Sequence, residues 1–193
     1  MLMTNENVQL FPHDKIFAKL IIPLVPQAVR PNHLTVLRLC LTPFVLWFLW
    51  REQWALALAF FLVAAFTDAL DGSLARVRKQ ITIWGTIADP VADKILIGST
   101  VVLFVAEAVN VLFALIIVLI EVMIGLGAWY RKGHGEIASA NQYGKIKMVL
   151  QVLGVAALMV AKIAGLQLAV SVGVGTLTVA TVFAVVSLLT YGL

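Results

Sequence analysis

Long apolar runs separated by short polar connections dominate the chain. Six of these runs are long enough, at about 20 residues each, to cross the hydrocarbon core of a bilayer as helices. They lie at residues 34–50, 54–75, 83–106, 109–129, 145–165 and 168–190. In lipid, a helix satisfies all of its backbone hydrogen bonds within one segment, so each run is predicted to be a transmembrane helix.

A shorter segment with a different pattern precedes the first run. Within residues 14–25, Lys15 and Lys19 stand four positions apart beside apolar neighbours, and Pro23 and Pro26 end the pattern. This arrangement is typical of an amphipathic helix that lies on the membrane surface rather than one that spans it. We expect a short juxtamembrane helix here.

The composition supports a membrane protein. Of the residues, 62% are hydrophobic and 12% are charged, and the mean hydropathy is +1.01, whereas soluble domains carry about 25% charged residues. The predicted fold is an all-α integral membrane protein, with six transmembrane helices preceded by the amphipathic juxtamembrane helix. No linker divides it, so we expect one domain over residues 1–193. We also expect no cleavable signal peptide.

The net charge of +4 is carried mainly by short connections between apolar runs. No basic stripe with interleaved aromatic residues is present, so we expect no nucleic-acid partner. With the N-terminus inside, ten basic residues fall on the cytoplasmic side and only Arg51 and Lys162 fall outside. The ten are Lys15, Lys19, Arg30, Arg76, Arg78, Lys79, Arg131, Lys132, Lys145 and Lys147. This asymmetry predicts a multi-pass cell (inner) membrane protein with both termini in the cytoplasm.

Four aspartates interrupt the second and third apolar runs. Asp68 and Asp71 are three positions apart, and Asp89 and Asp93 are four apart, so each pair shares one face of its helix. The connection between the two runs is short, which makes their helices antiparallel neighbours. All four carboxylates are therefore expected to converge in the half of the membrane next to the cytoplasm.

Such carboxylates are costly in lipid, at roughly 2.5–3.5 kcal/mol each on insertion scales, or on the order of 10 kcal/mol for four. Hard divalent cations, Mg²⁺ or Mn²⁺, are the natural compensation because they prefer carboxylate oxygens. Gly72, Ala75 and Gly85 lie in register with the aspartates, and their small size lets a ligand approach the backbone. Two non-enzymatic alternatives are a salt-bridged cluster that tunes helix packing and a small cation transporter.

The spacing of these residues matches a known signature. Asp68-x2-Asp71-Gly72-x2-Ala75-Arg76-x8-Gly85-x3-Asp89-x3-Asp93 resembles the signature of the CDP-alcohol phosphatidyltransferases at all eight of its fixed positions. The resemblance implies six transmembrane helices, a homodimer and a polar cavity that faces the cytoplasm. It also implies that a CDP-linked lipid, such as CDP-diacylglycerol, gives its phosphatidyl group to an alcohol and releases CMP.

The resemblance further implies roles for individual residues. Asp68, Asp71 and Asp89 would bind two divalent metal ions, and Asp93 would be the general base and a further metal contact. The residues implied to bind the CDP-lipid are Asp68, Gly72, Ala75, Arg76, Gly85, Asn32 and Thr35.

A second polar cluster bears on the acceptor alcohol. Gly144-Lys145-x-Lys147-x3-Gln151 and Pro31-Asn32-x-Leu34-Thr35-x2-Arg38 resemble phosphatidylglycerophosphate synthases, whose acceptor is sn-glycerol 3-phosphate. The phosphate of that acceptor would meet Arg38, Arg131, Lys145 and Lys147, although the lysines are also explained as topology anchors.

Two departures from those synthases keep other acceptors open. This chain has Ile120-Glu121 where they carry Arg-Glu, and Lys147-Met148 where they often carry Lys-Thr. Inositol phosphate, phosphatidylglycerol and a free alcohol therefore stay as alternative acceptors for the same chemistry.

Overall fold

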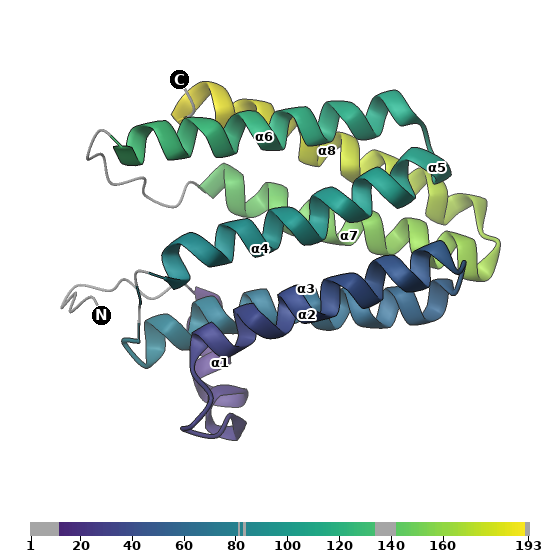
Figure 1. The fold of residues 1–193 in the computed structure, drawn as a ribbon. Coiled ribbons are helices and arrows are strands. Elements are labelled where there is room, and N and C mark those ends of the chain that lie inside the picture. The colour runs from purple at the N-terminus through teal and green to yellow at the C-terminus, as the bar shows by residue number, and fades with distance from the viewer. Residues whose placement is uncertain (1–11, 81, 83, 134–141, 192–193) are drawn as a thin grey trace. The chain divides into compact units, whose positions relative to one another are not determined.

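The computed structural model describes residues 12–80, 82, 84–133 and 142–191, and the elements in these ranges are helices (Figure 1). This finding confirms the predicted all-α class. The elements are α1 Pro12–Leu20, the 3₁₀ turn η1 Ile22–Leu24, α2 Pro31–Trp50, α3 Trp54–Val77, α4 Gly85–Thr100, the π-helical turn η2 Val101–Val105, α5 Ala106–Ala108, α6 Val111–Gly133, α7 Gln142–Ala164 and α8 Gln167–Tyr191.

Each predicted apolar run corresponds to a helical stretch with ends shifted by a few residues. The third run differs in its interior, because α4 passes through η2 into α5 rather than continuing as one regular α-helix. A π-helical turn accommodates an extra residue in a helix and changes the faces that the segments on either side present. Apolar periodicity carries no signal for such a turn.

Four helices are long and apolar enough to cross a membrane: Pro31–Trp50, Trp54–Val77, Tyr143–Ala164 and Gln167–Thr190. A shorter apolar stretch lies within α6, at Val111–Gly127. Helix α4 has only 16 residues, and Asp89, Asp93 and Lys94 lower its apolar character.

The chain forms two compact units. The first comprises Met1–Phe44 with Phe60–Leu96, and the second comprises Val45–Ala59 with Ile97–Leu193. Helices α2 and α3 each contribute to both units.

In the first unit, the N-terminal segment packs against α2 and α3. Its apolar core consists of Ile22, Leu34, Leu70 and Leu74, with Phe17 and Val77 among the residues packed around it. In place of the helix predicted over residues 14–25, the structure has α1 followed by η1, and Pro23 lies within η1.

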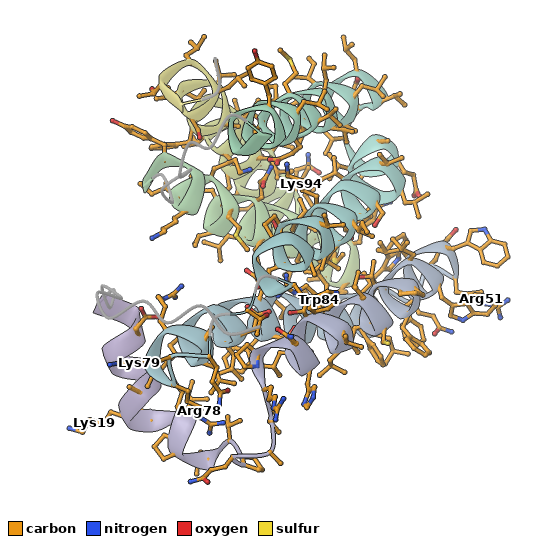
Figure 2. All side chains as sticks on the ribbon, turned by 60° about the vertical axis from the view of Figure 1, so that its left-hand side comes forward. Lys19, Arg51, Arg78, Lys79, Trp84 and Lys94 are labelled. Carbon is orange, nitrogen blue, oxygen red and sulfur yellow. The ribbon has the colours of Figure 1, made fainter. Side chains whose placement is uncertain are left out.

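A basic side chain closes the turn that follows η1. The Arg78 guanidinium donates hydrogen bonds to the carbonyl oxygens of Val25 at 2.6 Å, Val29 at 3.0 Å and Pro26 at 3.2 Å. Lys19 and Lys79 are exposed, and both lie in the same region of this unit as Arg78 (Figure 2).

In the second unit, α7 and α8 pack closely through two glycines. A Cβ atom added to Gly154 would lie 2.7 Å from Leu177 Cγ, and one added to Gly173 would lie 2.7 Å from Leu158 Cγ. Small residues at such positions let the backbones of membrane helices approach each other. Gly154 and Gly173 therefore have a packing role.

Candidate functional site

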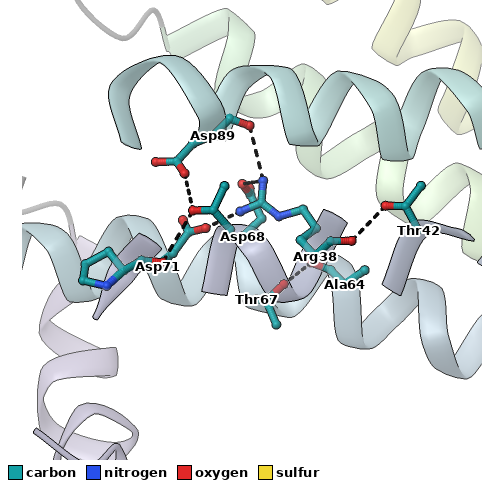
Figure 3. Close-up of polar contacts among 9 residues, drawn as sticks. Arg38, Thr42, Ala64, Thr67, Asp68, Asp71 and Asp89 are labelled. Atoms are coloured by element: carbon teal, nitrogen blue, oxygen red, sulfur yellow. Dashed lines mark hydrogen bonds and ion pairs between the residues drawn. The ribbon is translucent and has the colours of Figure 1, made fainter. Parts of the chain in front are cut away.

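Aspartates from α3 and α4 meet around one arginine of α2 (Figure 3). Arg38 is 0% exposed, and its Nη1 lies 2.6 Å from Asp68 Oδ1 while its Nη2 pairs with Asp71. The same guanidinium donates to the backbone carbonyl of Asp89 at 3.4 Å. The structure thus brings three of the four predicted aspartates to a single point.

The local sequence explains how the side chains reach that point. Asp68 and Asp71 are one helical turn apart on α3, and Thr35 and Arg38 are one turn apart on α2, so each pair shares a face. Thr35 donates a hydrogen bond to the carboxylate of Asp89 and so joins α2 to α4. Two helix faces and one carboxylate from a third helix therefore build the cluster.

The charges of this cluster do not cancel. The guanidinium pairs with the carboxylates of Asp68 and Asp71, and the carboxylate of Asp89 accepts from Thr35 nearby, which leaves two net negative charges when all the groups are ionised. Uncompensated charge in a low-dielectric region is strongly unfavourable, so the cluster favours the approach of a further cation.

The donor chemistry of the cluster fits Mg²⁺ or Mn²⁺, because it offers only carboxylate oxygens of the kind these ions prefer. Among the described residues, no group of three His, Cys, Asp or Glu side chains is arranged to hold a metal ion as it stands. Arg38 accounts for part of this, since its guanidinium contacts both carboxylates of α3. A metal would therefore bind carboxylates that Arg38 holds in this structure.

Asp93 lies one turn beyond Asp89 on α4 and is half-buried. Four positions along a helix place two side chains on the same face. Asp93 is therefore placed near the cluster by its position on the helix.

Gly85, Asn32 and Thr82 form a second contact between the start of α4 and α2. The Thr82 hydroxyl donates to Asn32 Oδ1 at 2.9 Å and accepts from the backbone N–H of Gly85 at 2.9 Å. A Cβ atom on Gly85 would lie 3.2 Å from Asn32 Oδ1 and 3.5 Å from Asp89 Oδ2. The signature glycine therefore keeps space open between Asn32 and the carboxylate of Asp89.

The signature arginine and its neighbours face the N-terminal helix. Arg76 pairs with Asp14 of α1, and Ser73 donates to the same carboxylate. Ala75 lies between them in sequence and is half-buried.

Sequence reasoning missed Asp14, Ser73 and Thr82. Asp14 is the first residue of the predicted amphipathic helix, which was inferred from Lys15 and Lys19 without regard to Asp14. Ser73 occupies a variable position of the signature. A threonine three residues before a helix start was a signal for Thr82, because such hydroxyls cap the first backbone N–H groups.

The residues predicted at the acceptor phosphate fall in different places. Arg38 lies in the carboxylate cluster of the first unit, whereas Lys145 and Lys147 lie at the start of α7 in the second unit. The backbone of Arg131 belongs to α6, and its side chain lies outside the described part of the structure.

Lys147 has a buried acidic partner. Its Nζ lies 2.6 Å from Glu121 Oε1, and Gln151 Nε2 donates to the same oxygen at 2.9 Å. Glu121 thus joins α6 to α7. It is the glutamate of the Arg-Glu pattern, in which Ile120 stands in place of the arginine. Lys145 is half-buried two positions earlier on α7.

Comparison with known proteins gives a consistent result. A sequence profile described as CDP-alcohol phosphatidyltransferase matches residues 28–190. Two similar proteins are each named CDP-diacylglycerol–glycerol-3-phosphate 3-phosphatidyltransferase. The one from Pectobacterium atrosepticum is 37% identical over 138 residues, which cover 67% of this chain and 75% of that protein. The one from Wigglesworthia glossinidia brevipalpis is 29% identical over 169 residues, which cover 83% of this chain and 91% of that protein.

A third protein of the same name, from Pseudomonas fluorescens, is 46% identical over 83 residues. That match covers 42% of this chain and 43% of the relative. The profile match extends over most of the chain and includes every residue of the carboxylate cluster. The chain therefore belongs to the CDP-alcohol phosphatidyltransferase family.

Proposed function

We propose that this protein transfers the phosphatidyl group of CDP-diacylglycerol to sn-glycerol 3-phosphate and forms phosphatidylglycerophosphate and CMP. The observation that carries the proposal is the convergence of Asp68, Asp71 and Asp89 on Arg38, because these aspartates are fixed positions of the family signature. The names of the similar proteins support glycerol 3-phosphate as the acceptor.

The reaction is a displacement at phosphorus. A hydroxyl oxygen of the acceptor forms a bond to the phosphorus that carries the diacylglycerol, and the bond from that phosphorus to the CMP oxygen breaks. CMP leaves with the electron pair, and the carboxylate of Asp93 takes the hydroxyl proton. A positioned base of this kind contributes roughly 10²–10⁴-fold to the rate.

Asp68, Asp71, Asp89 and Asp93 would hold Mg²⁺ or Mn²⁺. Two such ions, when bound, neutralise the diphosphate and stabilise the charge on the leaving CMP. The CDP-lipid would also contact Asn32, Thr35, Gly72, Ala75, Arg76 and Gly85.

The phosphate of the acceptor is proposed to bind Lys145 and Arg131, with Lys147 nearby on α7. Positive charge at the start of a helix adds to the favourable field of the helix N-terminus for an anion. Lys147 neutralises Glu121, and we propose that Lys145, half-buried two positions earlier on α7, makes the phosphate contact. For Arg38, complete burial between carboxylates favours a role as their counter-charge over contact with an acceptor.

We also propose a single membrane domain of six spans that acts as a homodimer in the inner membrane, with both termini and the site facing the cytoplasm. The exposed Lys19 and Lys79, which lie in the same region of the first unit, support this orientation. In a Cys40→Ala background, a cysteine at Gln80 should be protected from an impermeant thiol reagent added to intact cells. A cysteine at Glu52 should be labelled. Labelling of the cysteine at Gln80 from outside would show that the proposed orientation is wrong.

The activity is tested by CMP release from CDP-diacylglycerol by the purified protein, with glycerol 3-phosphate, glycerol, inositol phosphate and phosphatidylglycerol compared as acceptors. A cation transporter or a structural protein releases no CMP, and preference for another acceptor changes the product but keeps the chemistry.

Asp93→Asn should lower turnover by about 10²–10⁴-fold while binding of CDP-diacylglycerol persists. Glu107→Gln, an exposed acid in the second unit, is the matched control. Near-normal turnover of Asp93→Asn would show that Asp93 is not the general base.

A further inference from the structure

The carboxylate of Asp14 accepts hydrogen bonds from Arg76 and Ser73 in a fully buried position. Asp14 is 0% exposed, and its two oxygens accept hydrogen bonds from Arg76 Nε at 2.7 Å and Arg76 Nη2 at 2.8 Å. Ser73 Oγ donates to Asp14 Oδ1 at 2.7 Å. A two-point contact of this kind fixes the plane of a guanidinium as well as its position.

The guanidinium that Asp14 holds lies over another signature residue. Gly72 stands one turn before Arg76 on α3, and a Cβ atom added to Gly72 would lie 3.3 Å from Arg76 Nη1. The absence of a side chain at Gly72 therefore leaves room for the arginine itself. The Arg76 side chain is 24% exposed, whereas the side chain of its counter-ion Asp14 is fully buried.

The helix that supplies Asp14 is anchored independently of this ion pair. Phe17 of α1 packs on the apolar core of the first unit, and its ring stacks on Phe66 with centroids 6.0 Å apart. The turn after η1 is closed by Arg78. Because these contacts already hold α1 against α3, a buried aspartate is not needed for attachment, and burying one is unfavourable unless it is paired.

We propose that Asp14, which lies outside the family signature, is a positioning residue that aims Arg76 at the diphosphate of the CDP-linked lipid. This inference rests on the proposed function, in which Arg76 contacts the CDP-lipid, and it assigns that contact to the diphosphate. Arginine loses considerable rotational freedom when it binds, and a guanidinium that is already fixed binds at a smaller entropic cost. Asp14 provides this fixation from one edge, and Ser73 fixes Asp14.

The test is steady-state kinetics of CMP release with each substrate varied in turn. Asp14→Asn keeps the shape of the side chain and removes its charge, so KM for CDP-diacylglycerol should rise by about tenfold, the effect of one charge-assisted hydrogen bond. We expect kcat and KM for glycerol 3-phosphate to change by less than about twofold, because neither depends on Arg76 in the proposal. Glu107→Gln serves as the matched control.

A double-mutant comparison separates positioning from a structural role. In an Arg76→Gln background, Asp14→Asn should cause no further rise in KM, because the residue through which it acts is gone. Ser73→Ala keeps the ion pair and removes one hydrogen bond, so it should raise KM by about threefold and provides a milder variant.

Three results would overturn the inference: an unchanged or lower KM in both Asp14→Asn and Ser73→Ala, an equal rise in the Arg76→Gln background, or a rise in both substrates' KM together. Absence of CMP release by the wild-type protein would instead reject the proposed function, and this role of Asp14 with it. The two failures are therefore distinguishable from one set of measurements.

Discussion

Replacement of Arg38 by methionine tests how the carboxylate cluster is stabilised. Methionine has similar length and suits an apolar surrounding, but it carries no charge. The change removes the ion pair to Asp68 at 2.6 Å, the ion pair to Asp71 and the hydrogen bond to the Asp89 carbonyl. Three carboxylates then lie close together without their shared counter-charge.

The expected loss of stability follows from burial. Removing one partner of a buried ion pair costs roughly 3–5 kcal/mol, because the other charge stays buried and uncompensated. Arg38 and Asp71 are both nearly inaccessible, so their pair should contribute an amount in this range. Asp68 is 19% exposed, and water screens that pair to a smaller contribution. We expect a total loss of about 4 kcal/mol in the free energy of unfolding.

The measurement is the thermal unfolding midpoint in detergent, followed by circular dichroism, with and without Mg²⁺. The midpoint of Arg38→Met should fall well below that of the wild type in the absence of metal. Mg²⁺ should raise the variant's midpoint more than the wild type's, because the carboxylates no longer hold a competing cation. Arg51→Met is the matched control, since Arg51 is exposed and its guanidinium carbon lies 5.9 Å from the centroid of a Trp47 ring.

Two results would refute this reasoning. A metal-free midpoint of Arg38→Met equal to that of the control would show that the ion pairs contribute no net stability. An equal response of the variant and the wild type to Mg²⁺ would show that Arg38 and the metal do not share the same carboxylates.

Two further predictions concern the second unit. Gly154→Ala should destabilise the protein by about 1–3 kcal/mol because the added methyl would lie 2.7 Å from Leu177 Cγ, whereas Gly175→Ala, with no atom within 4 Å, should leave the unfolding midpoint nearly unchanged. An equal shift in both variants would contradict the close packing of α7 on α8. Lys145→Ala should raise KM for glycerol 3-phosphate by about 10–100-fold with little change in KM for CDP-diacylglycerol. An unchanged KM for the acceptor would return Lys145 to the role of a topology anchor.

The sequence alone predicted the features that depend on local periodicity. Apolar runs located the helices to within a few residues, as for α8, predicted over 168–190 and observed over Gln167–Tyr191. The spacing of Asp68 and Asp71 predicted one shared helix face, and a short connection predicted that Asp89 would approach them. These predictions succeed because the helix repeat is a property of the backbone and does not depend on the neighbours of the helix.

The choice of partners was decided by the tertiary structure. Arg38 lies between two carboxylates, and Lys147 pairs with Glu121, which are partners that the sequence did not single out. Contact of either residue with an acceptor phosphate stays a prediction. Asp14 carried no signal beyond its place in an amphipathic segment, yet it holds the signature arginine. A charged side chain in a low-dielectric region is stable only beside an opposite charge, but the sequence contains several oppositely charged residues that could be its partner. The packing of the helices brings one of them within 3 Å, and that distance selects the pair.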